Sequence, residues 1–360
     1  MKRWLLLLLL VLVARPVGAV PLIQMGDPFP QVAMPTPADA AQRAYLGLPE
    51  GTTFTLDQVG GKVVLVEILN VLCPHCQRQT KPYNELYRKI EADPATRGQI
   101  RMLGVAVGNN KEQIDDFVSV YSVLFPVVSD AQFNVHRAIG GSRTPFSIYV
   151  LQRGAGQPGV VAGTQLGEDY EVDDLFKYLK DVANMTPADF SGLATEEAPA
   201  KVKIAPVLTP QQTEERVEKL LAAQGPLSGF KRVDIPDRVV YTALAGPADK
   251  PQRYFAEVVS RASICDVCHD VHFIYVFDTS GRIVGFAPIQ LTKYGNVEWN
   301  DAEVAKMRGR VLGQYLSAPR PFDPQVDAVT RATMTSAIIF DQLARGEELM
   351  NALQRKGLLQ

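Results

Sequence analysis

The chain has 360 residues, of which 46% are hydrophobic and 21% are charged, a composition typical of a folded globular protein. Its formal net charge is −2, so it lacks the basic excess that a nucleic-acid partner requires, and we expect no such partner. The length exceeds that of one typical hydrophobic core, which predicts two domains.

Residues 1–19 have the pattern of a secretory signal peptide. Lys2 and Arg3 precede an unbroken apolar run at 4–13, and small residues then lead to Ala19. The apolar run is about half of the roughly 20 residues that a membrane-spanning helix needs. We therefore expect an exported, periplasmic protein that is either soluble or held by an uncleaved N-terminal anchor.

Residues 20–185 alternate between predicted strands and predicted helices. Strands are expected at 62–69, 100–107, 125–128, 146–151 and 159–166, and helices at 74–90, 111–123 and 170–182. This alternation predicts an α/β domain with parallel βαβ units. From 186 to 210 the apolar period lapses among several prolines, which predicts a linker.

In residues 211–360 the predicted strands follow one another directly and do not alternate with helices. A helix is expected at 211–223, strands at 238–242, 254–260, 272–277 and 282–288, and helices at 302–316 and 336–353. The turn between the last two strands is typical of a hairpin. This order predicts a separate α+β domain.

The four cysteines form two close pairs, Cys73/Cys76 and Cys265/Cys268. A disulfide that closes so short a loop constrains the unfolded chain little, so the spacing indicates redox chemistry or metal binding rather than a structural framework. Export agrees with a redox role, because disulfides form and persist outside the cytosol.

The sequence Cys73-Pro74-His75-Cys76 follows a predicted buried strand and opens a predicted helix. The N–H groups and the dipole at a helix start stabilise an anion, so we expect a lowered pKa for the Cys73 thiol. His75 can add a positive charge within the same turn. These positions predict Cys73 as the attacking, more exposed sulfur and Cys76 as the resolving thiol.

Two further residues fit this chemistry. Glu67 lies inside the apolar strand, where burial would raise its pKa and let it relay a proton to or from Cys76. The alternative is a solvated glutamate on an edge strand. A cis Pro145 after Thr144 would present a backbone edge that suits an extended substrate.

Residues 24–183 resemble the thioredoxin-fold domains of exported thiol-disulfide oxidoreductases and peroxiredoxin-like proteins. The matching features are the apolar strand that contains Glu67, the Cys-Pro-His-Cys sequence, Phe-Pro-Val-Val-Ser-Asp at 125–130, and Thr144-Pro145. The resemblance implies the following roles: nucleophile at Cys73, resolving cysteine at Cys76, buried acid at Glu67 and cis proline at Pro145.

The second pair lies in Cys265-Asp266-Val267-Cys268-His269, which matches the C-x-x-C-H attachment sequence of c-type haem. The match abuts a predicted strand, whereas a haem attachment sequence normally lies on a helix. Three interpretations stay open: a second redox dithiol, a haem held by Cys265, Cys268 and His269, and a metal site or inert pair.

Near the C-terminus, the order Asp327, Thr330, Arg331, Ala332, Thr333 resembles the flavinylation sequence of the FMN-binding domain found in respiratory complexes and related exported proteins. The resemblance covers about residues 250–347. It implies FMN joined to Thr333 through a phosphodiester by a flavin transferase. Arg331 stands where that family has glycine, and its side chain could obstruct attachment or pair with the FMN phosphate. The alternatives are a retained fold that has lost its flavin and a Thr/Ser-rich helix cap.

The leading interpretation is an exported thiol-disulfide oxidoreductase that acts on protein thiols or disulfides or accepts electrons from an upstream donor. In it, electrons pass between FMN, Cys265/Cys268 and Cys73/Cys76. The alternatives are a haem electron carrier and a non-enzymatic binding or assembly factor that holds a partner on its thioredoxin surface.

Overall fold

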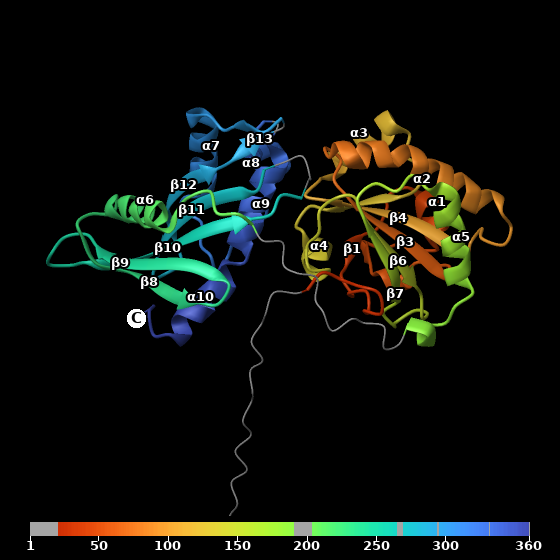
Figure 1. Ribbon diagram of the computed structural model, residues 1–360, viewed down its shortest axis with the longest axis horizontal. Coiled ribbons are helices and arrows are strands. Elements are labelled where there is room, and N and C mark those ends of the chain that lie inside the picture. Colours follow the sequence, from red (N-terminus) through yellow and green to blue (C-terminus); the bar gives the residue numbers. More distant parts are fainter. Residues whose placement is uncertain (1–20, 191–203, 265–268, 294, 331, 360) are drawn as a thin grey trace, which may run out of the picture.

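The computed structural model describes residues 21–190, 204–264, 269–293, 295–330 and 332–359. Over these residues the chain forms two units, each built around a five-stranded sheet (Figure 1). The predicted signal peptide at 1–19, the pair Cys265/Cys268 and Arg331 lie outside the described residues.

The sheet of the first unit consists of β3 (Val63–Leu69), β4 (Ile100–Val107), β5 (Val127–Asp130), β6 (Phe146–Leu151) and β7 (Val160–Leu166). Its order is β5-β4-β3-β6-β7, with β3, β4 and β5 parallel and β6 and β7 antiparallel. All seven residues of the central strand β3 are buried, which explains its continuous apolar run. The predicted α/β sheet is confirmed. β5 begins later than predicted, since Pro126 has no N–H for the ladder.

Helices cover both faces of this sheet because side chains alternate along each strand. Val63 and Leu65 pack in a cluster with α2 (Pro74–Ala92), α3 (Lys111–Tyr121) and α5 (Val172–Ala183). Val64 and Val66 pack on the other side with residues of the N-terminal segment, α1 (Ala40–Leu46) and α4 (Asn134–Ala138). Short elements complete this unit: β1 (Met34–Pro35), β2 (Thr53–Phe54) and the 3-10 helix η1 (Leu56–Gln58).

The sheet of the second unit is an antiparallel meander of β8 (Leu227–Ile235), β9 (Arg238–Ala245), β10 (Gln252–Arg261), β11 (Val271–Asp278) and β12 (Ile283–Gln290). α6 (Pro210–Ala222) covers one face, and α7 (Asp301–Val311) and α9 (Thr333–Ala344) contribute to the core on the other. The remaining elements are β13 (Thr292–Lys293), β14 (Val297–Glu298), α8 (Pro324–Asp327) and α10 (Gly346–Arg355). β8 was not predicted, because its mostly exposed residues give an edge strand no apolar alternation.

The prediction of one helix at 336–353 is wrong, since the chain breaks between α9 and α10 at Arg345. Gly346 lies against the Leu316 side chain, and a Cβ at this position would come within 2.6 Å of Leu316 atoms. The break therefore depends on a packing contact between segments that are thirty positions apart. The helix predicted at 302–316 likewise ends early, at Val311.

Part of the predicted linker at 186–210 belongs to the first unit. Pro187–Phe190 forms the 3-10 helix η2, and Phe190 is buried in the same cluster as α2 and α5. The sequence did not predict this, because a single aromatic residue among prolines and polar residues gives no apolar period. The helix α6 begins at Pro210, where Thr209 is the N-cap and its side chain accepts from the Gln212 N–H.

The two units pack against each other through α4 of the first and α9 of the second, which face one another in Figure 1. Arg137 of α4 pairs with Asp341 of α9, and the Gln132 side chain donates to the Phe322 carbonyl at 3.2 Å. One buried apolar cluster contains residues of both units. A further contact joins the start of β6 to the second unit, since the Thr144 N–H donates to the Ile264 carbonyl at 2.7 Å.

Candidate active site

Cys73 and Cys76 lie where β3 passes into α2. Cys73 is the N-cap residue of α2, Pro74 occupies the first helical position, and the Cys73 N–H donates to the Asn70 carbonyl at 3.0 Å. Both cysteines are free thiols. Cys73 is 2% exposed and Cys76 is 1% exposed, so the expected difference in exposure is absent. The thiol of Cys73 lies 3.5 Å from the Thr144 carbonyl, to which it donates.

Burial raises the pKa of the Cys76 thiol well above its usual range, and the neighbouring Cys73 and Glu67 act in the same direction. The Asn70 N–H opposes this shift by donating to the Cys76 sulfur at 3.4 Å. Asn70 itself is buried, and its amide donates to the Val107 carbonyl at 2.8 Å. Asn70 was not predicted as a site residue, although its place directly after a buried strand and before Cys73 indicates such a role.

Glu67 lies in the middle of β3, between Gly104 of β4 and Ser147 of β6, and is 2% exposed. Burial, and secondarily the charge of Cys73, raise its pKa to about 8. The edge-strand alternative is therefore wrong, because β3 is the central strand. A carboxyl group with such a pKa can hold a proton at neutral pH and exchange it with a nearby thiol.

His75 is oriented by groups outside the Cys-Pro-His-Cys sequence. Its Nδ1 lies 2.5 Å from Glu168 Oε1, and the Arg78 guanidinium donates to the same oxygen at 2.6 Å. Burial alone would raise the pKa of Glu168, but the hydrogen bonds from Arg78 and His75 outweigh it and lower that pKa. Glu168 was not predicted, because it lies 93 positions from His75.

The Thr144–Pro145 bond is cis, and the Thr144 backbone adjoins the dithiol as expected. This backbone edge already has a partner within the chain. The Thr144 N–H donates to the Ile264 carbonyl at 2.7 Å, and the Thr144 hydroxyl donates to the same oxygen at 3.1 Å. Ile264 follows β10 of the second unit and is buried. The contact between Thr144 and Ile264 was not predicted from the sequence.

Other atoms of the second unit also reach the dithiol face. The Asn70 amide donates to the Met334 sulfur at 2.6 Å, and a Cβ on Gly108 would lie 3.4 Å from the end of the Met334 side chain. Thus α9 and the segment after β10 both contact residues that surround Cys73 and Cys76.

The second pair, Cys265 and Cys268, lies outside the described residues. His269 is exposed, and its N–H donates to the Asn296 side chain at 3.0 Å. His272 is buried on β11, with its Nδ1 2.9 Å from the Ser260 hydroxyl. Among the described residues there is no group of three or more His, Cys, Asp or Glu side chains placed to hold a metal ion.

The residues expected to hold FMN fit that role only in part. Thr333 is half-buried as the first residue of α9, and the N-cap residue Ala332 makes no side-chain capping bond, so the helix start can accept a phosphate. Asp327 is fully buried, and its carboxylate accepts from Arg320 at 2.7 and 3.1 Å. Thr330 is exposed. The Asp327 side chain is therefore engaged in holding the loop before α9.

Comparison with known proteins agrees with this geometry. Residues 25–166 match the AhpC/TSA family. The thiol-disulfide oxidoreductase ResA of Geobacillus thermodenitrificans (strain NG80-2) is 28% identical over 121 residues, which are 33% of this chain and 66% of that protein. ResA of Halalkalibacterium halodurans is 26% identical over 105 residues, 29% of this chain and 57% of that protein. The chain thus spans less than two thirds of the length of these relatives.

Among solved structures, the secreted thiol-disulfide isomerase of Corynebacterium glutamicum is similar, with 19% sequence identity and a TM-score of 0.35. The match covers 48% of this chain and 96% of that one. The family match and the sheet order together identify the first unit as a thioredoxin-like α/β domain. Of the helices in the described part of the chain, none has the length and hydropathy to span a membrane.

Proposed function

We propose that the protein is an exported thiol-disulfide oxidoreductase that uses Cys73 and Cys76. The observation that supports this most is the placement of Cys73 at the N-cap of α2 with its sulfur against the Thr144 carbonyl. Relatives named thiol-disulfide oxidoreductase over the same region add support. Protein thiols or disulfides are the substrates that this chemistry implies.

The reduced site transfers two electrons in two steps. The Cys73 thiolate attacks a substrate disulfide, so that a mixed disulfide forms and one substrate sulfur leaves as a thiolate and takes a proton. Cys76 then loses its proton and attacks the Cys73 sulfur, which releases the second substrate thiol and leaves a Cys73–Cys76 disulfide. Glu67 in its carboxylate form accepts the proton from Cys76, and its pKa of about 8 makes it a stronger proton acceptor than an exposed carboxylate.

The first test compares the wild type with Cys73→Ser in the reduction of a disulfide-linked peptide. We expect the wild type to reduce the peptide and Cys73→Ser to be inactive, because the attacking sulfur is gone. Exchange activity that survives in Cys73→Ser would overturn the assignment of the nucleophile.

The partner of this site within the chain is the second pair, Cys265/Cys268. Cys265 follows Ile264 directly in the sequence, and the Ile264 carbonyl accepts the two hydrogen bonds of Thr144 beside Cys73. An extended substrate would use the same backbone edge. In this exchange Cys73 attacks an oxidised Cys265–Cys268 disulfide, forms a bond to one sulfur and releases the other as a thiolate.

A trapping experiment tests this internal exchange. In the Cys76→Ser variant, purified with the second pair oxidised, the mixed disulfide cannot be resolved and should accumulate. Non-reducing peptide mass spectrometry should then detect Cys73 linked to Cys265 or Cys268. Cys76→Ser combined with Cys265→Ser and Cys268→Ser is the control. If Cys73 is trapped only on other proteins, the internal partner is wrong while the oxidoreductase assignment stands.

A flavin on the second unit is the finer part of the proposal, and it would supply one- or two-electron chemistry to the dithiols. The half-buried Thr333 at the start of α9 supports it, whereas the engaged Asp327 does not. Coexpression with a flavin transferase followed by intact mass tests it, with Thr333→Ala as the control. Wild-type protein without added FMN mass would remove the covalent claim. The absorption spectrum of the same sample separates flavin from a haem at Cys265, Cys268 and His269.

A further inference from the structure

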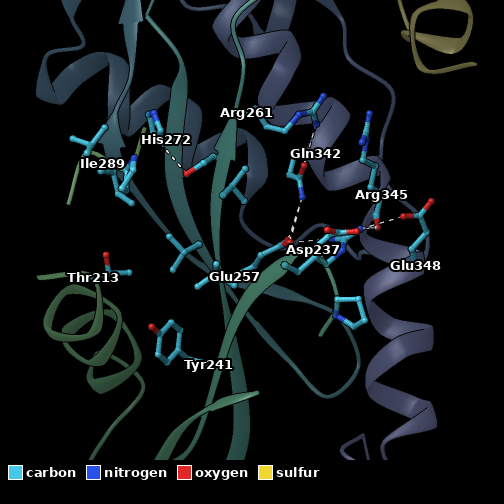
Figure 2. Close-up of a pocket in the computed structure, with 18 of the residues that line it drawn as sticks. Thr213, Asp237, Tyr241, Glu257, Arg261, His272, Ile289, Gln342, Arg345 and Glu348 are labelled. Atoms are coloured by element: carbon cyan, nitrogen blue, oxygen red, sulfur yellow. Dashed lines mark hydrogen bonds and ion pairs between the residues drawn. The ribbon is translucent and has the colours of Figure 1, made fainter. Parts of the chain in front are cut away.

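A cavity of about 1030 Å³ lies at the junction of the two units (Figure 2), and neither Cys73 nor Cys76 lines it. Its walls come from α4 of the first unit, from the segment that leads into α6, and from β9, β10, β11, α9 and α10 of the second. Neither Thr333 nor Asp327 lines it, so it is distinct from the expected FMN attachment point.

One side of this cavity gathers guanidinium groups around a single buried carboxylate. Asp341 is 4% exposed and pairs with Arg137, with Arg261 at 2.7 Å and with Arg345 at 3.4 Å. The three arginines line the cavity and come from both units, Arg137 from α4 and the others from the second unit. Three cations thus share one anion.

Beside this cluster, Arg238 pairs with two carboxylates, the buried Glu257 and the exposed Glu348, the latter at 3.2 Å. Arg238 donates to Glu257 at 3.0 Å, and Gln342 lies between Glu257 and Arg261 in Figure 2. The three arginines around Asp341 exceed it by 3 − 1 = 2 positive charges, while Arg238 is offset by Glu257 and Glu348. The exposed charged side chains that line the cavity are Arg232, Asp237 and Glu348.

Arg345 shows the effect of this excess. Its Nε is buried and has no hydrogen-bond partner among the described residues. Burial, and then the charge of Arg261, lower the pKa of Arg345 to about 10 even though Asp341 acts in the opposite direction. The Arg345 side chain as a whole is 36% exposed and lines the cavity, so an anion there can reach its guanidinium.

The other side of the cavity combines apolar side chains with Thr213 and His272. Tyr241 and Ile289 line it, and Figure 2 shows them apart from the Arg261 and Arg345 side chains. A ligand that fills the cavity therefore needs an anionic group for the arginines and an apolar or aromatic body for this wall.

We propose that this cavity binds a phosphate monoester with an aromatic or apolar body, held by Arg137, Arg261 and Arg345. A phosphate monoester is close to a dianion at neutral pH and matches the excess of two charges in the cluster around Asp341, whereas a monocarboxylate supplies only one. The planar fork of arginine also suits bidentate phosphate contacts.

Such a ligand would strengthen the contact between the units. Arg137 belongs to the first unit, and Arg261 ends β10 only three positions before Ile264, whose carbonyl meets Thr144 at the dithiol. A phosphate bound by both arginines therefore favours the arrangement in which Ile264 covers the Thr144 backbone beside Cys73. The proposal does not depend on the redox function.

Calorimetric titration of the reduced, full-length mature chain at low salt tests the proposal with phenyl phosphate, inorganic phosphate and benzoate. We expect phenyl phosphate to bind more tightly than the other two, because only it supplies both the dianion and the ring. Arg345→Gln should weaken its binding about tenfold or more, since a charge-assisted contact is lost.

Arg355→Gln is the matched control, because it removes the same charge from an exposed position on α10 outside the cavity. Arg137→Gln, on the other unit, should also weaken binding, and circular dichroism checks that each variant is folded. The proposal is overturned if the wild type shows no binding of phenyl phosphate, if benzoate binds equally well, or if folded Arg345→Gln and Arg137→Gln bind as the wild type does.

Discussion

Replacing Glu67 with glutamine probes the buried acid of the dithiol site. Burial raises the pKa of Glu67 from its usual 4.5 to about 8. The unfolded chain therefore loses this proton near pH 4.5 while the folded protein keeps it, so stability falls as the pH rises through this window. At pH 7 the interval is 7 − 4.5 = 2.5 pH units, or about 3 kcal/mol of lost stability at about 1.36 kcal/mol per unit.

Glu67→Gln cannot ionise, so this loss disappears in the variant. The buried amide has its own cost of about 1–3 kcal/mol, but that cost does not change with pH. Relative to the wild type, the free energy of unfolding of the variant should therefore rise by about 3 kcal/mol between pH 4.5 and pH 7. Urea denaturation of the reduced protein, followed by circular dichroism at several pH values, measures this difference.

The exposed Glu85 on α2 provides the matched control, since Glu85→Gln removes a carboxylate that stays in water. Its pH profile should follow that of the wild type. If the profiles of Glu67→Gln and the wild type run parallel from pH 4.5 to pH 8, Glu67 is already ionised in the folded protein. Glu67 would then lack the raised pKa that makes it a good proton acceptor for Cys76.

Three further changes test the packing around the site. Gly140→Ala should destabilise the protein by about 2 kcal/mol or more in urea denaturation, because φ is +89° and a Cβ would lie 2.1 Å from a backbone oxygen of the N-terminal segment. Met334→Ala removes the side chain that meets Asn70, so Cys73 should be alkylated faster than in the wild type, as timed by mass spectrometry. Phe190→Ala should lower the free energy of unfolding by about 3–5 kcal/mol in the same urea assay, because Phe190 is 5% exposed. A loss below about 1 kcal/mol would mean that Phe190 is part of the linker and not of the core.

The local geometry of the dithiol could be derived from sequence because strand, turn and helix follow one another within thirty residues. The apolar run before Cys73 predicted a buried strand, and Pro74 marked the first helical position. Burial of Glu67 followed from the same run, since a residue inside a central strand has little access to water. The strand, the helix start and the burial of Glu67 depend on apolar periodicity and on residues close in the sequence, so the sequence alone predicts them.

The surroundings of the dithiol were decided by tertiary structure, because they depend on contacts between distant segments. Glu168 reaches His75 across 93 positions, and Ile264 reaches Thr144 across 120. Sequence alone predicted an exposed Cys73, and no local pattern indicates that a second unit contacts its backbone edge.

The charge cluster at the junction also depends on tertiary contacts that the sequence does not indicate. Each arginine by itself is typical of a solvated surface, and the residues of the cluster are spread over α4, β10 and α9. Composition by itself determined the near-neutral total, a formal charge of −2. Only the packing of the two units decided that three guanidinium groups share the Asp341 carboxylate, because charge balance at a site depends on distances in space and not on order along the chain.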